Sequence, residues 1–286
     1  MFSMELILAA FGGGILGALI GALPAFIFTG FVGLIGVAVI ASGGPATILG
    51  DVVFGTLLGP HIAFAGGVAA AAYAANKKNL LASGGDILTP LKKTNDAGVI
   101  LVGGIFGILG YVINSLYASI ALPTDTVALT VFTSGVLARF IFGQTGLFGK
   151  YSAQGEVAAA TELPKRSFVP DAKSLTFVAL YSLGLGLVVS YLVDLTQINV
   201  LGFCISAALL IFAQMGFDMP ATHHITLVAG YAAIATGNIF IGAAFAVISG
   251  ILCEIVARTF NSYCDTHIDP PATTIFILSF IIFIFM

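Results

Sequence analysis

Two stretches of this 286-residue chain combine an acid, a proline and a threonine at the start of an apolar run. The first is DMPATHH, residues 218–224, and the second is DPPAT, residues 269–273. An Asp before a helix accepts hydrogen bonds from unpaired backbone N–H groups, and Pro is tolerated in the first helical turn. Both stretches therefore predict a helix that begins within an apolar region, with Asp218 and Asp269 as candidate caps.

The first stretch also carries two neighbouring histidines, His223 and His224. The segment HHITLVAGYAAIATGN, which begins at His223, resembles PHIAFAGGVAAAAYAAN, which begins at Pro60, and the alignment matches His61 with His224. Imidazole donates and accepts hydrogen bonds and titrates near physiological pH, which suits proton coupling or recognition of a polar solute. Neighbouring helical residues point about 100° apart, so we expect His223 and His224 not to face one ligand unless the helix is broken there. His61 and His224 can face each other across a pseudo-two-fold axis.

Polar residues in or beside apolar runs are candidates for function, because ionisable groups are costly in lipid. Plain helix capping explains some of these acids equally well, and Glu254 can simply reach the membrane interface near Arg258. The predicted substrate or ion pathway consists of Asp51, His61, Asn114, Asp125, Asp218, His223 and His224. The predicted helix breaks lie at Pro45, Pro60, Pro123, Pro220 and Pro271.

Other kinds of site have weaker support in the sequence. Cys264 and His267 have a metal-like spacing but lack a second pair, so we predict no metal site and no cofactor. No phosphate-binding P-loop, HExxH motif or paired Ser/His signature is present, so we predict no catalytic residues and no enzyme. No basic stripe with interleaved aromatic residues is present, and nucleic acid is not an expected partner.

The composition is that of an integral membrane protein whose main partner is the lipid bilayer. Hydrophobic residues make up 59% of the chain and charged residues only 8%, against about 25% charged residues in soluble proteins. The apolar runs are long and do not alternate in ten-residue units, so they predict membrane-spanning helices and an all-α fold. We predict ten spans: 4–22, 25–42, 61–76, 97–120, 125–143, 174–194, 199–216, 222–236, 239–258 and 272–286. Residues 43–60 are too short and too rich in glycine for a span, and favour a broken or re-entrant segment.

The basic residues predict the orientation of these spans. Every Lys and Arg falls on one side of the ten-span arrangement, which is the cytoplasmic side of a multi-pass cell-membrane protein. Both the N-terminus and the C-terminus are then predicted on the non-cytoplasmic side. The basic residues are Lys77, Lys78, Lys92, Lys93, Arg139, Lys150, Lys165, Arg166, Lys173 and Arg258.

The same arrangement divides the chain into two halves of five spans. The predicted halves are residues 1–143 and 174–286, and the cytoplasmic linker 144–173 joins them. Because five is an odd number, the halves have opposite orientations, as in transporters built from inverted repeats.

The leading hypothesis for function is a secondary transporter for a small solute or ion, with a site between the halves and coupling to a proton or sodium gradient. In this hypothesis Asp51, Asp218 and the histidines provide the coupling. The alternative is a passive channel for a small solute or ion, and a membrane enzyme is a third class. A homo-oligomer remains an open alternative.

Overall fold

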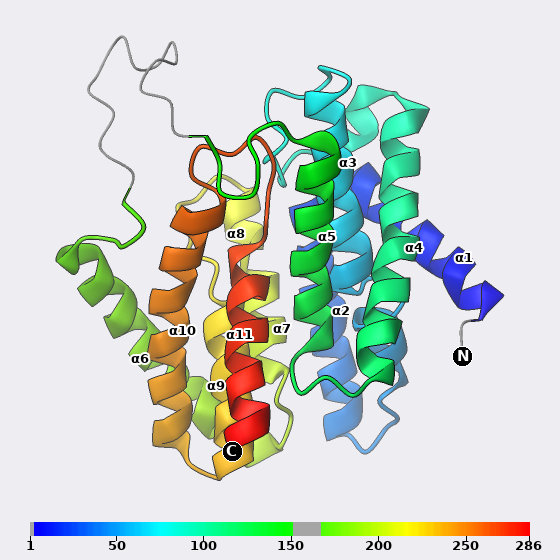
Figure 1. The fold of residues 1–286 in the computed structure, drawn as a ribbon. Coiled ribbons are helices and arrows are strands. Elements are labelled where there is room, and N and C mark those ends of the chain that lie inside the picture. Colours follow the sequence, from blue (N-terminus) through cyan, green and yellow to red (C-terminus); the bar gives the residue numbers. More distant parts are fainter. Residues whose placement is uncertain (1–2, 151–166) are drawn as a thin grey trace.

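The computed structural model describes residues 3–150 and 167–286, which form helices joined by loops and contain no β-strand (Figure 1). The first group of helices is α1 (Met4–Ile20), α2 (Ala22–Ala41), η1 (Ile48–Val53), η2 (Pro60–Phe64), α3 (Ala65–Asn76), η3 (Leu91–Thr94), α4 (Ala97–Ser119) and α5 (Thr126–Phe142). The second group is α6 (Ala172–Thr196), α7 (Leu201–Leu209), α8 (Ile211–Gln214), α9 (His223–Thr236), α10 (Ile239–Phe260) and α11 (Pro270–Phe285). Residues 151–166 of the predicted linker, with Lys165 and Arg166, lie outside the described residues.

Each predicted apolar segment contains a helix, and most bounds agree within three residues. The exceptions are segment 61–76, in which α3 begins only at Ala65 after η2, and segment 199–216, which α7 and α8 divide. Within the described ranges, four helices are long and apolar enough to cross a membrane, namely α2, α4, α6 and α10. Large apolar side chains point outward from two of them, including Phe177 and Leu180 on α6 and Phe240 on α10. An outer surface of this kind suits lipid and not water, so the chain is a membrane-associated, all-helical protein.

The glycine-rich segment 43–60 contains no helix of spanning length. Its only helix is η1, a π-helix of six residues, and a turn follows before η2 begins at Pro60. The hydroxyl of Thr29 in α2 donates to the Leu58 carbonyl at 2.9 Å, which satisfies one backbone group of the irregular segment. An irregular backbone in an apolar environment needs such partners, because lipid supplies none.

Two predicted helix starts differ in the structure. Asp269 caps α11 by accepting a hydrogen bond from the Ala272 N–H at 2.7 Å. Asp218, by contrast, is exposed in the non-helical segment 216–222, and the residue before α9 is Thr222. The predicted cap at Asp218 was therefore wrong, because a capping side chain reaches an N–H only two or three residues further along the chain.

Close helix crossings depend on glycine. A side chain at Gly14 in α1 would place its Cβ 2.1 Å from the Gly103 carbonyl oxygen in α4. At Gly17 the Cβ would lie 1.8 Å from the carbonyl oxygen of Ala63 in η2. Small residues let helix backbones approach this closely, and van der Waals packing is a main source of helix association in lipid.

The two groups show the same pattern of packing between their helices. In the first group α1 packs on α3 and α4, and α5 also packs on α3 and α4. In the second group α6 packs on α9 and α10, and α11 also packs on α9 and α10. Between the groups, α2 packs on α7 and α5 packs on α11 (Figure 1).

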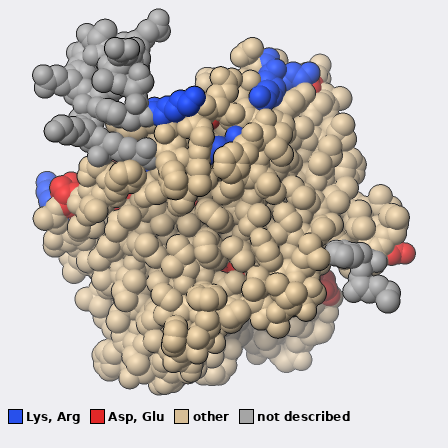
Figure 2. Space-filling model, in the orientation of Figure 1, with Lys and Arg blue, Asp and Glu red and all other residues tan. Residues whose placement is uncertain are grey.

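A buried arginine of the first group forms hydrogen bonds with the upper end of the second group. Arg139 of α5 is 1% exposed, and its guanidinium donates to the side chain and carbonyl of Thr266 at 2.8 and 2.7 Å. It also donates to the carbonyls of Leu147 and Phe260. The other described Lys and Arg side chains that are visible in Figure 2 gather at the upper end and the upper-left flank, and the lower end of this face shows none.

Candidate functional site

A cavity of about 620 Å³ lies between the two groups of helices. This volume is within the range of about 300–1,000 Å³ that is common for small-molecule sites. The first group contributes residues of α2, η2 and α5, and the second group contributes residues of α6, α7, α9, α10 and α11. Apolar and aromatic side chains form most of its wall, including Leu23, Phe26, Phe64, Phe203, Leu227 and Ile275.

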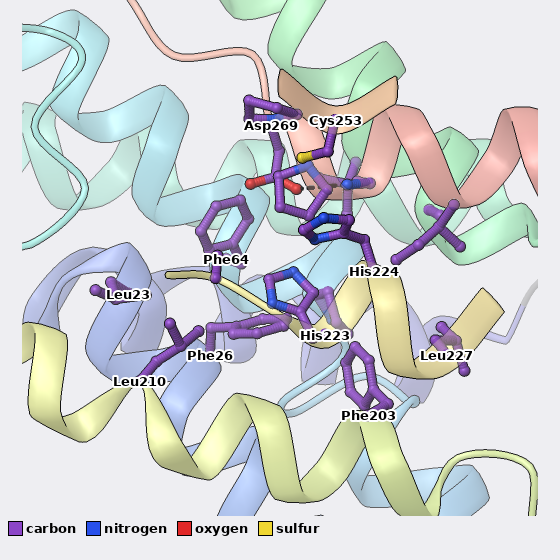
Figure 3. Close-up of a pocket in the computed structure, with 18 of the residues that line it drawn as sticks. Leu23, Phe26, Phe64, Phe203, Leu210, His223, His224, Leu227, Cys253 and Asp269 are labelled. Atoms are coloured by element: carbon purple, nitrogen blue, oxygen red, sulfur yellow. Dashed lines mark hydrogen bonds between the residues drawn. The ribbon is translucent and has the colours of Figure 1, made fainter. Parts of the chain in front are cut away.

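His223 and His224 both line this cavity, at the first two positions of α9. They are 6% and 4% exposed, and their ring centroids lie 6.0 Å apart with the planes nearly perpendicular. Figure 3 shows the rings beside each other, with Asp269 and Cys253 on one side and Phe26 and Phe203 on the other. The sequence allowed the two histidines to face one ligand only if the helix is broken at this point, and α9 does begin here, in the cavity wall, after a non-helical segment.

The imidazole of His223 sits within a cluster of aromatic rings. Its centroid is 4.6 Å from that of Phe26 and 5.8 Å from that of Phe203. Nδ1 of His223 and Nδ1 of His224 are enclosed by protein and have no hydrogen-bond partner among the described residues. Buried polar atoms normally have partners, and these two rings lack them. Because Nδ1 is enclosed, Nε2 is the nitrogen that each ring can offer to a ligand in the cavity.

Two carboxylates in the cavity wall already have partners. Asp125 caps α5 through the Ala128 N–H at 2.8 Å and accepts from the hydroxyl of Tyr231 at 2.8 Å. Asp269 caps α11 and lies 3.3 Å from Nε2 of His267. Glu254 of α10 also lines the cavity and is only partly buried.

Of the seven predicted pathway residues, Asp125, His223 and His224 line the cavity. Asp51 and Asp218 are exposed, and Asn114 of α4 lies away from the cavity. Three of the predicted break prolines, Pro60, Pro220 and Pro271, line the cavity wall, whereas Pro45 and Pro123 do not.

His61 does not meet His224 in the cavity. It is 3% exposed in η2, but its neighbours Pro60 and Phe64 line the cavity in its place. A Cβ on Gly110 of α4 would lie 1.8 Å from the His61 carbonyl, so η2 packs tightly against α4 at this residue. This packing decides the rotation of η2, which residue spacing could not predict.

Sequence reasoning missed Tyr231 and His267. Leu227 lies three residues after His224, and Tyr231 lies four residues after Leu227, so all three side chains share one face of α9. This spacing is the signal that identifies Tyr231 once His224 is chosen. His267 lies two residues before the capping Asp269, and only the loop geometry brings its ring to that carboxylate.

One family model matches the chain in two stretches, residues 1–160 and residues 149–286. Its description is a family of unknown function, DUF7973. The two stretches overlap only within residues 149–160, between the two groups of helices. No curated protein and no solved structure matches the chain.

Proposed function

The chain belongs to the family of unknown function DUF7973, and we propose that it is a secondary transporter of a small solute in the cell membrane. The substrate site in this proposal is the cavity between the two groups of helices. The main support is that both groups of helices form the wall of this cavity, and that two buried histidines in the wall lack complete hydrogen bonding. Transporters with internal repeats bind substrate at such an interface between the repeats.

We propose that the two groups are inverted repeats, each with five membrane spans. The matching helix pairs support this, because α1, α3, α4 and α5 pack as α6, α9, α10 and α11 do. The helices that pair across the groups, α2 with α7 and α5 with α11, are also counterparts, as a pseudo-two-fold axis requires. The two matches of one family model to the two parts of the chain support the same arrangement.

Two short helices support a transport site in the interior. α3 has 12 residues and α9 has 14, whereas a full span needs about 20. α9 follows the non-helical segment 216–222, and α3 continues the five-residue π-helix η2, which follows a turn. Residues at both starts lie in the cavity wall: Pro60 and Phe64 in η2, and His223 and His224 in α9. Broken helices of this kind place helix ends at a substrate in many secondary transporters. Rocking of one repeat against the other would then expose the cavity to either side.

Coupling to an ion gradient would use the cavity residues. Asp51 and Asp218, the acids first expected in this role, are exposed and away from the histidines. Asp269, His267 and His223 form one cluster of polar side chains in the cavity wall, and Tyr231 and Asp125 form a second. Each cluster contains a proton donor and a proton acceptor at short distance, which is the chemistry of proton coupling.

Purified full-length protein in lipid vesicles tests the proposal. Uptake of radiolabelled octanoate, hexylamine and sorbitol is measured under an imposed proton gradient, an imposed sodium gradient and no gradient. We expect accumulation of one solute above its external concentration under one gradient, and loss of that accumulation in Asp125→Asn. Asp51→Asn is the matched control, because it neutralises an exposed acid outside the cavity.

Two results would contradict a coupled transporter. Downhill flux that responds to neither gradient, at rates far above conformational cycling, would favour the channel instead. Equal uptake in Asp125→Asn, Asp51→Asn and unmodified protein would remove the cavity from the transport path.

A further inference from the structure

We propose that the start of α9, with His223 and His224, binds the carboxylate of a small organic acid whose apolar part fills the cavity. This inference rests on the proposed function, because it names the substrate class of the same site. Binding can nevertheless be measured without transport, so the two proposals can fail separately.

The backbone at the start of α9 has unpaired hydrogen-bond donors. No side chain caps this helix, and the N–H groups of His223, His224 and Ile225 donate no hydrogen bond within the described residues. The three residues are buried. Unpaired N–H groups at a helix start carry partial positive charge and favour an anion.

Two of the other helix starts in the cavity wall, those of α5 and α11, do not offer this chemistry. At α5 the Asp125 carboxylate accepts from the Ala128 N–H, and at α11 the Asp269 carboxylate accepts from the Ala272 N–H. Both starts therefore already have their anion within the protein. α7 and α9 both begin in the cavity wall without a side-chain cap, and only the start of α9 adds two histidines to its N–H groups. At α9 an incoming carboxylate replaces the missing cap.

The two imidazoles add donors at the same place. Only Nδ1 of each ring is enclosed and without a partner, which leaves Nε2 as the nitrogen that can reach a ligand in the cavity. A neutral or charged imidazole donates from Nε2 when that nitrogen carries the proton. Two side-chain donors and the helix N–H groups match the two oxygens of a carboxylate.

The acids in the wall do not make the cavity a cation site. The carboxylates of Asp125 and Asp269 each already have two partners, one at each oxygen. Neither carboxylate therefore has an oxygen without a partner, because Tyr231, His267 and backbone N–H groups take all four. Glu254 of α10 also lines the cavity, but it is partly exposed and is not one of these donors.

The rest of the cavity suits an apolar body. Phe26 contacts Phe64 and Phe203 with ring centroids 5.8 and 5.5 Å apart, and all three rings line the cavity. Leu227 stands one turn below the histidines on α9. A ligand that is anionic at one end and apolar along its length therefore satisfies both parts of the site.

Equilibrium binding of radiolabelled octanoate to the purified full chain in detergent tests this assignment. Octanamide and octylamine compete as the neutral and cationic analogues of equal length. We expect octanoate to bind at least about tenfold more tightly than either, since a lost charge-assisted hydrogen bond costs about 1.5–3 kcal/mol. His223→Gln and His224→Gln are expected to weaken octanoate binding by at least about tenfold.

Two further variants separate this site from general damage. Thr222→Asp places a carboxylate at the cap position of α9, so it should abolish octanoate binding while thermal stability is kept or raised. His61→Gln is the matched control, because it changes a buried histidine that does not line the cavity. It should bind octanoate as the unmodified protein does. Thermal unfolding of every variant verifies that it folds.

The assignment is overturned if octylamine binds more tightly than octanoate, or if Thr222→Asp and His224→Gln both bind octanoate normally. Competition by oleate separates a small soluble acid from a membrane lipid, and binding of oleate alone would overturn the small-acid class. Gradient-driven uptake of another solute without octanoate binding would remove this assignment and keep the transporter. Octanoate binding without gradient-driven uptake of any solute would keep the carboxylate site and remove the transporter.

Discussion

Tyr231 of α9 donates a hydrogen bond to Asp125 of α5 at 2.8 Å, across the boundary between the two groups of helices. The same carboxylate caps α5, so one side chain joins a helix start, a cavity wall and an interface between groups. Ser279 of α11 adds to this contact by accepting from the Asp125 N–H at 2.8 Å. A movement of one group against the other at this point must stretch or break these bonds.

Tyr231→Phe removes the hydroxyl and leaves the ring in place. We expect a loss of about 0.5–2 kcal/mol in unfolding free energy, which is usual for one side-chain hydrogen bond within a membrane protein. We also expect a changed rate of gradient-driven uptake, because the bond crosses between the groups. Tyr117→Phe is the control, since the Tyr117 hydroxyl bonds Thr133 within the first group at 3.1 Å. An equal effect of both variants on uptake would show that the crossing bond has no special role.

Gly17→Ala should destabilise the protein, whereas Gly12→Ala should not. The added Cβ at Gly17 would meet the Ala63 carbonyl at 1.8 Å, and at Gly12 it would meet nothing within 4 Å. Overpacking of this kind costs about 1–3 kcal/mol. The chain has no Trp, so unfolding is best followed by a thiol-reactive dye that detects the buried Cys204 and Cys253. Equal melting temperatures for the two variants would show that the α1 crossing is not close-packed.

Arg139→Lys should also destabilise the protein, although the charge is kept. The guanidinium of Arg139 bonds Thr266, Leu147 and Phe260 at once, and an ammonium cannot reproduce that fork. We expect a loss of about 2–4 kcal/mol, as for an incomplete buried network. Arg258→Lys is the control, because Arg258 lies on the same end of the molecule and is only partly buried. The same dye assay compares the two, and an unchanged melting temperature in Arg139→Lys would refute the role of the network.

Cysteine labelling tests the orientation in the membrane. α4 has 23 residues and is about 34 Å long at about 1.5 Å per residue, so its ends should lie on opposite sides of a bilayer. In a background without the native cysteines, Ser119→Cys should react with a membrane-impermeant maleimide on intact cells. Lys93→Cys, before the other end of α4, should react only after permeabilisation. The reverse pattern would invert the predicted topology, and labelling of both would show that α4 does not cross.

Several features could be predicted from the sequence because they depend on nearby residues. The helices arise from apolar runs that must satisfy their own backbone hydrogen bonds in lipid, and most of their predicted bounds agree with the structure within three residues. The cap at Asp269 depends on a residue three positions away, and the pattern DPPAT predicted it. The lack of a spanning helix in residues 43–60 could be predicted from their glycine content.

The contents of the cavity could not be predicted, because they depend on contacts between distant residues. Tyr231 and Asp125 are separated by 106 positions, and their meeting follows from how the two groups pack. The rotation of η2 against α4 turns His61 out of the cavity wall, and the path of the segment before α9 leaves Asp218 exposed. Local sequence thus determined which segments are helices and where DPPAT caps one. Only tertiary packing decided that the two histidines of DMPATHH share a cavity with Asp125 and Asp269, since helix rotation is set by close contacts between distant residues.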